Sequence, residues 1–368
     1  MAFEPRYRTL VDLLEQSLAV NGSRELFGTK KDGRWRFVTY AEFGGAVERF
    51  RAGLSSLGVG RGDRVAVISN NRVEWAVAAY ASYGSGAALV PMYEAQNPDE
   101  WEFIVRDCEA KVLVVANARV FAKARALLSR VATLRSIVLL EDAADRADSR
   151  IVTYASMLDA GRGAAPSPPS PDDVATLLYT SGTTGNPKGV VLTHGNLASN
   201  VSAAHEVFPI RPTDRTLSIL PWAHAFGQTA ELHTMISFGA SMALCEGVDR
   251  ILDNLAEVSP TILCCVPTIF NRLYTAVQQQ LEARPRLVRA LASAALRVKA
   301  RQRSGDAGSL PERLAVGLVD ALVFQKVRAR LGGRLRFAIS GGAALSREVA
   351  EFIDSIGVVV YEGYGLTE

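Results

Sequence analysis

The chain has 368 residues, 48% of them hydrophobic, with 41 Lys and Arg against 38 Asp and Glu. This length predicts two or three domains with a substantial core. The net charge of +3 is too small to indicate a nucleic-acid-binding surface, so no nucleic-acid partner is expected. No apolar signal-peptide core follows the N-terminal MAFEPRYRTL, and we therefore expect a cytoplasmic protein.

In the first part of the chain, apolar strand-like runs alternate with helical segments. Thr39 and Glu42 form a capping box before a helix over 41–57, which ends at Gly58. The other expected helices follow Asn71 and cover 101–107 and 118–129, and the expected strands cover 64–69, 88–91, 112–116 and 136–140. Because parallel neighbours need crossover helices, the alternation predicts an α/β fold of two doubly wound, largely parallel sheets with flanking helices.

One stretch has the length of a membrane span. Residues 75–93 contain no charged side chain and are about as long as a bilayer requires. They are poor in Leu and Ile, and Gly84, Gly86 and Pro91 interrupt them. The stretch therefore predicts a helix, a tight turn and a buried strand.

A Pro/Ser-rich segment marks the clearest boundary in the chain. The sequence GAAPSPPSPDD holds four prolines among small and acidic residues, which neither a helix nor a sheet accommodates well. We expect a first α/β subdomain over 1–165, a linker over 166–172, and a second α/β subdomain with the nucleotide site over 173–368.

The segment 177–197, LLYTSGTTGNPKGVVLTHGNL, predicts a hairpin that holds a phosphate-binding loop. Glycines let backbone N–H groups turn toward a ligand, hydroxyls add donors, and Lys188 adds a positive charge. It is not a P-loop, because Pro187 precedes Lys188 and Gly189 follows it. A flexible linker is the alternative, but linkers rarely lie between two strand-like runs. The loop residues are Thr180, Ser181, Gly182, Thr183, Thr184 and Gly185.

The remaining elements continue the α/β pattern. Helices are expected from about Gly195, over 230–238 and 249–258, after Pro267 and after Ser346, and strands near Leu217 and over 241–244, 261–266, 337–340 and 358–361. Cys264 and Cys265 lie in the apolar run ILCCVP and indicate a buried strand rather than a metal site. Residues 284–303 predict an amphipathic helix with a basic face, either simply solvated or in contact with anionic lipid.

Three segments carry a family resemblance. YTSGTTGNPKG resembles the signature of the adenylate-forming superfamily of AMP-dependent synthetases and ligases, and SGGAAL from Ser340 and YEGYGLTE from Tyr361 fit the same family. Within it, the chain most resembles the long-chain fatty acyl-CoA synthetases. The activity this implies is ATP-dependent activation of a fatty acid to an acyl-adenylate and then to acyl-CoA, with release of AMP and pyrophosphate.

The resemblance also implies a site. Lys188 and the loop would bind the ATP phosphates, and Thr180 and Glu368 would hold the Mg²⁺ ion between them. His224 in LPWAHAFGQ, which on its residues alone is typical of a structural histidine, would lie beside the substrate carboxylate. The catalytic candidates are Lys188, His224, Thr367 and Glu368, and the further nucleotide-binding candidates are Gly341, Gly342, Ala343, Glu362, Gly363, Tyr364 and Gly365.

The family fold continues past the motif that ends at Glu368, into a ribose-binding aspartate and a mobile lid domain with a catalytic lysine. We expect this chain to be an incomplete form without that lid, with little or no activity alone. Two alternatives stay open: a nucleotide- or acyl-binding module without turnover, and an adenylation domain or ligase for an amino or aromatic acid.

Overall fold

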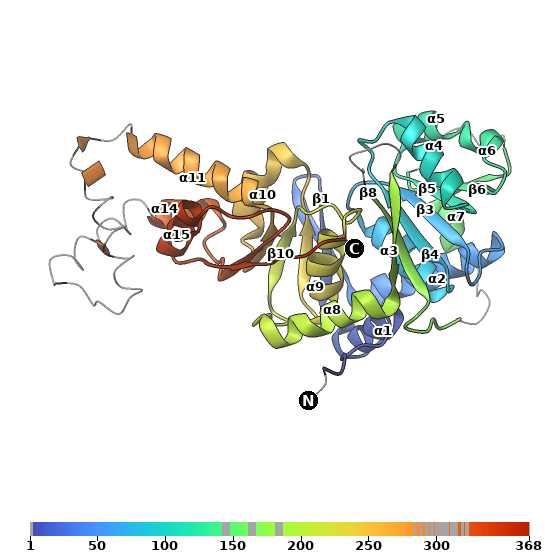
Figure 1. Ribbon diagram of the computed structural model, residues 1–368, viewed down its shortest axis with the longest axis horizontal. Coiled ribbons are helices and arrows are strands. Elements are labelled where there is room, and N and C mark those ends of the chain that lie inside the picture. Colours follow the sequence, from blue (N-terminus) through green and yellow to red (C-terminus); the bar gives the residue numbers. More distant parts are fainter. Residues whose placement is uncertain are drawn as a thin grey trace.

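The computed structural model describes residues 3–141, 148–160, 167–180, 187–282 and 324–367, together with isolated positions between 285 and 320. Two seven-stranded sheets form the frame, with helices packed around them (Figure 1). The first sheet has the strand order β7-β6-β5-β3-β4-β8-β9, and the second has the order β14-β13-β12-β10-β11-β1-β2. Each is parallel except for one antiparallel hairpin at an edge, β8–β9 and β1–β2. The predicted fold class is confirmed.

The first sheet is connected by helices, and four of those that the structure describes start at a residue whose side chain caps the helix. Its strands are β3 (Arg64–Ile68), β4 (Ala88–Met92), β5 (Val112–Val115), β6 (Ser136–Leu139), β7 (Ile151–Thr153), β8 (Val174–Thr180) and β9 (Lys188–Thr193). The helices are α2 (Tyr40–Ser56), α3 (Val73–Gly84), α4 (Pro98–Asp107), α5 (Ala118–Ala124), α6 (Leu127–Arg130) and α7 (Tyr154–Leu158). Asn97 and Asn117 cap α4 and α5 by accepting a backbone N–H from the first turn.

The second sheet begins with the N-terminal part of the chain. Its strands are β1 (Glu25–Lys31), β2 (Arg34–Thr39), β10 (Arg215–Ser218), β11 (Ser241–Leu244), β12 (Ile262–Cys265), β13 (Phe337–Ser340) and β14 (Val359–Glu362). The helical elements are α1 (Leu10–Asn21), α8 (His194–Val207), the π-helix η1 (Gly227–His233), α9 (Thr234–Ser237), η2 (Val248–Arg250), α10 (Ile251–Val258), α11 (Pro267–Glu282), α14 (Gln325–Arg330) and α15 (Arg347–Ser355).

Both sheets draw strands from either side of the Pro/Ser-rich segment. β1 pairs in parallel with β11, so the N-terminal hairpin completes the second sheet, while β8 pairs with β4 and completes the first. The described part of the segment, 167–173, contains no helix or strand. The division of the chain at 166–172 stays a prediction, and the sheets cut across it.

The uncharged stretch 75–93 is explained by complete burial. Every residue of α3 from Trp75 to Gly84 is buried, Gly86 turns the chain with φ +70°, and β4 is buried along its length. Trp75 packs against Trp222 of the second half, so α3 forms part of the contact between the two sheets. Among the described residues, no helix combines the length and apolar character needed to cross a membrane.

Two predicted helices differ from the structure. The helix expected over 230–238 begins earlier, at Gly227, and its first part is a π-helix followed by α9. The helix expected over 118–129 is divided into α5 and α6. Most of the predicted basic helix, 284–303, lies outside the described residues.

The capping box at the start of α2 provides a stability test. The Glu42 N–H donates to the Thr39 hydroxyl (3.2 Å), and the Thr39 N–H donates to the Glu42 carboxylate (2.7 Å). Thr39→Ala removes the hydroxyl acceptor, so we expect the free energy of unfolding to fall by about 1 kcal/mol in urea titrations. Thr39→Ser keeps the hydroxyl and should retain most of that stability; equal losses in both variants would show that the cap contributes nothing.

Candidate active site

The arms of the predicted phosphate loop form a regular hairpin. β8 and β9 pair antiparallel, and the register places Thr180 directly opposite Lys188. Lys188 is exposed at this end of the hairpin. The loop residues Ser181, Gly182, Thr183, Thr184 and Gly185 lie outside the described residues. The hairpin prediction is therefore confirmed for its arms.

Gly189 has a steric role in this hairpin. It lies opposite Tyr179, and a Cβ atom at Gly189 would be 3.1 Å from the tyrosine ring. The Tyr179 hydroxyl donates to the Asp107 carboxylate at the end of α4, and burial together with that contact raises the pKa of Tyr179. The ring thus fixes the β8 arm to the helix beneath it.

The predicted nucleotide-binding residues meet at one edge of the second sheet. β10, β12, β13 and β14 are parallel, so their carboxyl ends lie together. The Gly363 N–H donates to the Ser340 carbonyl (2.8 Å), and the Gly341 N–H donates to the Cys265 carbonyl (3.3 Å). The Leu345 N–H donates to the Glu362 carboxylate (3.2 Å). These bonds connect the ends of β12, β13 and β14.

Phe226 brings the histidine segment to the same edge. A Cβ atom at Gly341 would lie 2.8 Å from the Phe226 ring, so only glycine permits this close packing. Gly342 follows with φ +80°, a conformation that glycine adopts without strain. The structure therefore places the 224–226 segment beside the glycine turn that the resemblance assigned to adenine.

The imidazole of His224 is exposed but has a defined hydrogen bond. The Phe226 N–H points at its Nδ1 atom, 3.2 Å away. Nδ1 therefore accepts, and the neutral ring carries its proton on Nε2. Desolvation by the surrounding protein lowers the pKa of His224 below its ordinary value. The ring can present an Nε2–H donor to a carboxylate or phosphate oxygen.

Of the three other histidines, His194 and His233 are buried and His205 is half-buried. Burial lowers the pKa of His194 and His205 to about 4 and that of His233 to about 3. The His233 Nδ1 atom is 2.8 Å from the Tyr80 hydroxyl in the interior. His224 is thus the one exposed histidine.

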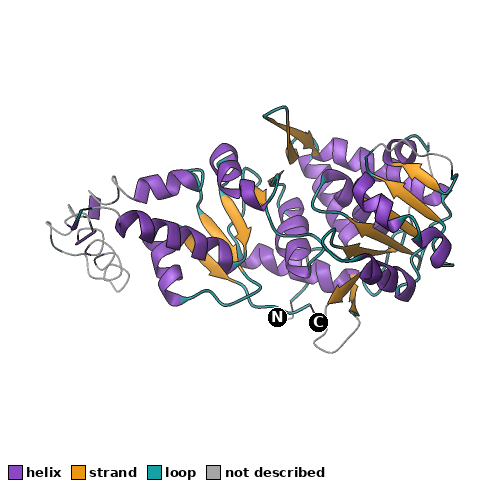
Figure 2. Ribbon diagram, turned by 90° about the horizontal axis from the view of Figure 1, so that it is seen from above, coloured by secondary structure: helices purple, strands orange, loops and turns teal. Residues whose placement is uncertain are grey.

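The C-terminal loop leaves β14 toward the hairpin. Tyr364 is 94% exposed, Gly365 is exposed, and Thr367 is half-buried. Both views place the C-terminal end of the chain beside the β8–β9 hairpin (Figures 1 and 2). Glu368 lies outside the described residues. The fold therefore brings the end of the loop after β14 to the β8–β9 hairpin, in which Thr180 pairs with Lys188.

Sequence reasoning missed a buried carboxyl group beneath this edge. Glu231 of η1 is fully buried; one of its oxygens accepts from the Ser218 hydroxyl and the Trp222 indole N–H, and the other has no hydrogen-bond partner among the described residues. Both polar atoms of buried Gln228 are also without a partner there. Burial raises the pKa of Glu231 to about 8. A charged residue in the otherwise uncharged run GQTAELHTMI was the available signal.

A protein family, curated relatives and solved structures match the chain. A model of the AMP-binding enzyme family matches residues 14–368. Long chain acyl-CoA synthetase 6, peroxisomal, from Arabidopsis thaliana is 34% identical over 93% of this chain and 49% of its own length. The long-chain-fatty-acid–CoA ligase FadD15 of Mycobacterium tuberculosis is 34% identical over 91% of this chain and 56% of its own length. The chain spans about half the length of the curated relatives it matches.

Solved structures share the fold. The anthranilate CoA ligase AuaEII in complex with anthranoyl-AMP superposes with a TM-score of 0.73 at 22% identity, over 99% of this chain and 61% of that one. The adenylation domain of a carboxylate reductase from Mycobacterium chelonae gives 0.79 at 20% identity, over 99% and 58%.

The buried carboxyl group predicts a pH dependence of stability. Between its ordinary pKa of 4.5 and the raised value of about 8, folded Glu231 keeps a proton that the unfolded chain has lost. The contribution of Glu231 to the free energy of unfolding is therefore complete at low pH. It decreases as pH rises through this window, by at most about 1.4 kcal/mol per pH unit. Glu231→Gln keeps an acceptor without titrating, so the wild type should lose stability relative to it from pH 5 to pH 8. We expect no such difference for Glu15→Gln on the exposed face of α1; parallel pH profiles of wild type and Glu231→Gln would contradict the assignment.

Proposed function

The chain belongs to the AMP-binding enzyme family, and from that premise we propose that it activates a long-chain fatty acid with ATP for transfer to coenzyme A. The observation that carries the proposal is the meeting of three segments at one sheet edge. The 224–226 segment, the glycine turn after β13 and the loop after β14 lie together, with the β8–β9 hairpin beside them.

The chemistry explains why such an edge is useful. A carboxylate is a poor acyl donor because its leaving group would be oxide. Attack of the carboxylate oxygen on the α-phosphorus of ATP forms the acyl-adenylate and releases pyrophosphate; the thiolate of coenzyme A then displaces AMP at the acyl carbon. The first step joins two anions, so catalysis depends mainly on charge neutralisation and alignment.

The phosphates are assigned to the hairpin. Lys188 and the loop Ser181–Gly185 would bind the β- and γ-phosphates, and Thr180 and Glu368 would supply hard oxygen ligands to the Mg²⁺ ion that neutralises them. Among the described residues, no three His, Cys, Asp or Glu side chains cluster closely enough to hold a metal.

The adenylate is assigned to the edge of the second sheet. The turn Gly341–Ala343 and the exposed ring of Tyr364 would contact adenine, with Glu362, Gly363 and Gly365 shaping that loop. Thr367 would lie near the α-phosphate. The Nε2–H of His224 would donate to the fatty acid carboxylate and orient it for attack.

The cellular context belongs to the same proposal. We expect the enzyme to act in the cytoplasm, with peripheral contact with anionic lipid through 284–303 as the way it meets fatty acids.

Loss of the Lys188 charge should weaken nucleotide binding. Titration calorimetry with Mg-ATP should show measurable binding by this chain, and Lys188→Ala should reduce it by roughly 1.5 to 3 kcal/mol through loss of a charge-assisted contact. Lys31→Ala removes an exposed lysine from β1 in the other sheet and serves as the matched control. Equal affinities of Lys188→Ala and wild type would count against the phosphate assignment.

Acid-dependent pyrophosphate exchange separates the candidate functions. In a longer form that spans the full length of the relatives, we expect palmitate to support exchange, and anthranilate and free amino acids to support none. If only an aromatic or amino acid supports exchange, the alternative ligase is favoured. If the protein binds ATP but no acid supports exchange, a binding module is favoured.

A further inference from the structure

Asn71 reaches from the first sheet to the segment that carries His224 on the second. It lies in the turn between β3 and α3, and its side-chain NH₂ donates to the Leu220 carbonyl (2.6 Å) and the Ser218 hydroxyl (3.1 Å). Its side-chain oxygen accepts the Trp222 N–H (2.8 Å). One half-buried amide thus makes three hydrogen bonds with a single short segment.

Glu231 holds the same segment from the opposite side. Its carboxyl oxygen accepts from the Ser218 hydroxyl and from the Trp222 indole N–H. Residues 218–222 are therefore held between an amide from the first sheet and a carboxyl group from η1. Since both partners are protein groups in a largely water-excluded interior, loss of either leaves polar atoms unsatisfied.

The held segment fixes the position of His224. The His224 N–H donates to the Pro221 carbonyl (3.1 Å), and the His224 carbonyl accepts the Gln228 N–H (3.0 Å) at the start of η1. The imidazole Nδ1 in turn accepts from Phe226. A shift of the Leu220–Trp222 backbone would therefore displace His224.

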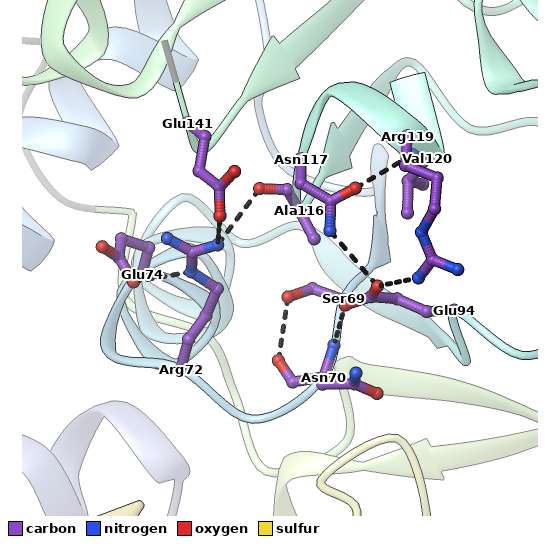
Figure 3. Close-up of polar contacts among 10 residues, drawn as sticks. All are labelled: Ser69, Asn70, Arg72, Glu74, Glu94, Ala116, Asn117, Arg119, Val120 and Glu141. Atoms are coloured by element: carbon purple, nitrogen blue, oxygen red, sulfur yellow. Dashed lines mark hydrogen bonds and ion pairs between the residues drawn. The ribbon is translucent and has the colours of Figure 1, made fainter. Parts of the chain in front are cut away.

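The turn around Asn71 is itself anchored on both sides (Figure 3). On one side, the Asn70 N–H donates to the Glu94 carboxylate after β4 (2.9 Å). On the other, Arg72 donates to the Ala116 carbonyl after β5 (3.1 Å) and pairs with Glu141 after β6 (3.2 Å). The ends of three neighbouring strands therefore hold the turn in place.

A second layer of contacts supports Glu94. The Asn117 side-chain NH₂ and the Arg119 guanidinium both lie 3.3 Å from its other carboxylate oxygen (Figure 3). The Glu94 side chain is only 10% exposed, whereas the Arg119 side chain that pairs with it lies largely in solvent. Asn71 thus projects from a rigid base.

We propose that Asn71 is a positioning residue for acid activation: it fixes residues 218–222 so that the His224 imidazole keeps Nδ1 on the Phe226 N–H and presents Nε2–H to the substrate carboxylate. The inference rests on the proposed function for the identity of that carboxylate. The hydrogen-bond contacts themselves do not depend on it. The side-chain amide of Asn71 then links the turn after β3 in the first sheet to residues 218–222 of the second.

Histidine NMR on this chain tests the positioning directly. With ¹⁵N-labelled histidine the spectrum contains four imidazoles, and His224→Ala identifies the one of interest. At a pH above the imidazole titration, we expect wild-type His224 in the Nε2–H form with an accepting Nδ1. Asn71→Ala should increase the population of His224 that carries its proton on Nδ1. Asn71→Asp keeps the acceptor for the Trp222 N–H and should give a smaller change in the same direction. If the alanine variant does not fold, the aspartate variant decides the question.

The matched control is Asn254→Ala. Asn254 is fully buried and makes two hydrogen bonds with Glu246, but it makes no hydrogen bond with 218–222 among the described residues. The Asn254→Ala variant should have a lower thermal midpoint of unfolding and an unchanged His224 spectrum. An unchanged His224 spectrum in the folded Asn71 variants, or an equal change in Asn254→Ala, would overturn the proposal.

A binding measurement separates this inference from the proposed function. The probe is the non-hydrolysable analogue palmitoyl sulfamoyl adenosine. We expect Asn71→Ala to weaken its binding about tenfold in the wild-type background and to have no further effect in His224→Ala. If Asn71→Ala weakens binding of the analogue equally with and without His224, Asn71 does not act through His224 and the positioning proposal is overturned. If His224→Ala binds the analogue as tightly as the wild type, the role of His224 in the proposed function is overturned. The histidine spectra then decide on Asn71.

Discussion

The parallel register of β10, β12, β13 and β14 is the constraint on which the rest of the structure depends. Parallel neighbours place all their carboxyl ends at one edge, where the loops leave the hydrogen-bonded ladder. The turn after β13 and the loop after β14 are therefore neighbours although their strands are separated by α15. Phe226 packs on Gly341 at this edge, which adds the histidine segment to it. A side chain at Gly341 would separate these two parts of the candidate site.

The second feature is the contact between the two sheets. Trp75 and Trp222 pack together, and the Asn71 and Glu231 hydrogen bonds lie next to them. The interior at this point is polar as well as apolar, because Glu231 and Gln228 keep atoms without protein partners among the described residues. Burial raises the pKa of Glu231 to about 8 and so favours its neutral form, since an unpaired charge in the core is costly. A neutral carboxyl group there can hold the 218–222 loop by hydrogen bonds without adding a negative charge beside the site that we propose for ATP and the fatty acid.

Local sequence signals predicted the elements better than their assembly. The capping box at Thr39 and the cap at Ser346 were clear because their side chains act within one turn of the chain. The strands over 241–244 and 337–340 match their predicted bounds because each is a short apolar run between turns. The hairpin β1–β2 was missed, although Asp32 and Gly33 form its turn with positive φ values, a recognisable signal. Its pairing with β11 joins distant parts of the chain, which no local pattern shows.

For the candidate site, too, the sequence indicated the separate segments better than their proximity. The residues of 177–197 indicated the hairpin, and the resemblance added the glycine turn and His224. The proximity of the glycine turn and the histidine segment follows from strand register and from the packing of Phe226. Asn71 and Glu231 carry no motif, and their importance is visible only in the hydrogen bonds they make across the two sheets.

A crystal structure of this chain with palmitoyl sulfamoyl adenosine would test the central claim most directly. The account predicts adenine against Gly341–Ala343, the sulfamoyl group between His224 and the β8–β9 hairpin, and Asn71 still bonded to Leu220. Adenine bound elsewhere, such as at the polar edge of the first sheet around Glu94 and Arg72, would contradict it.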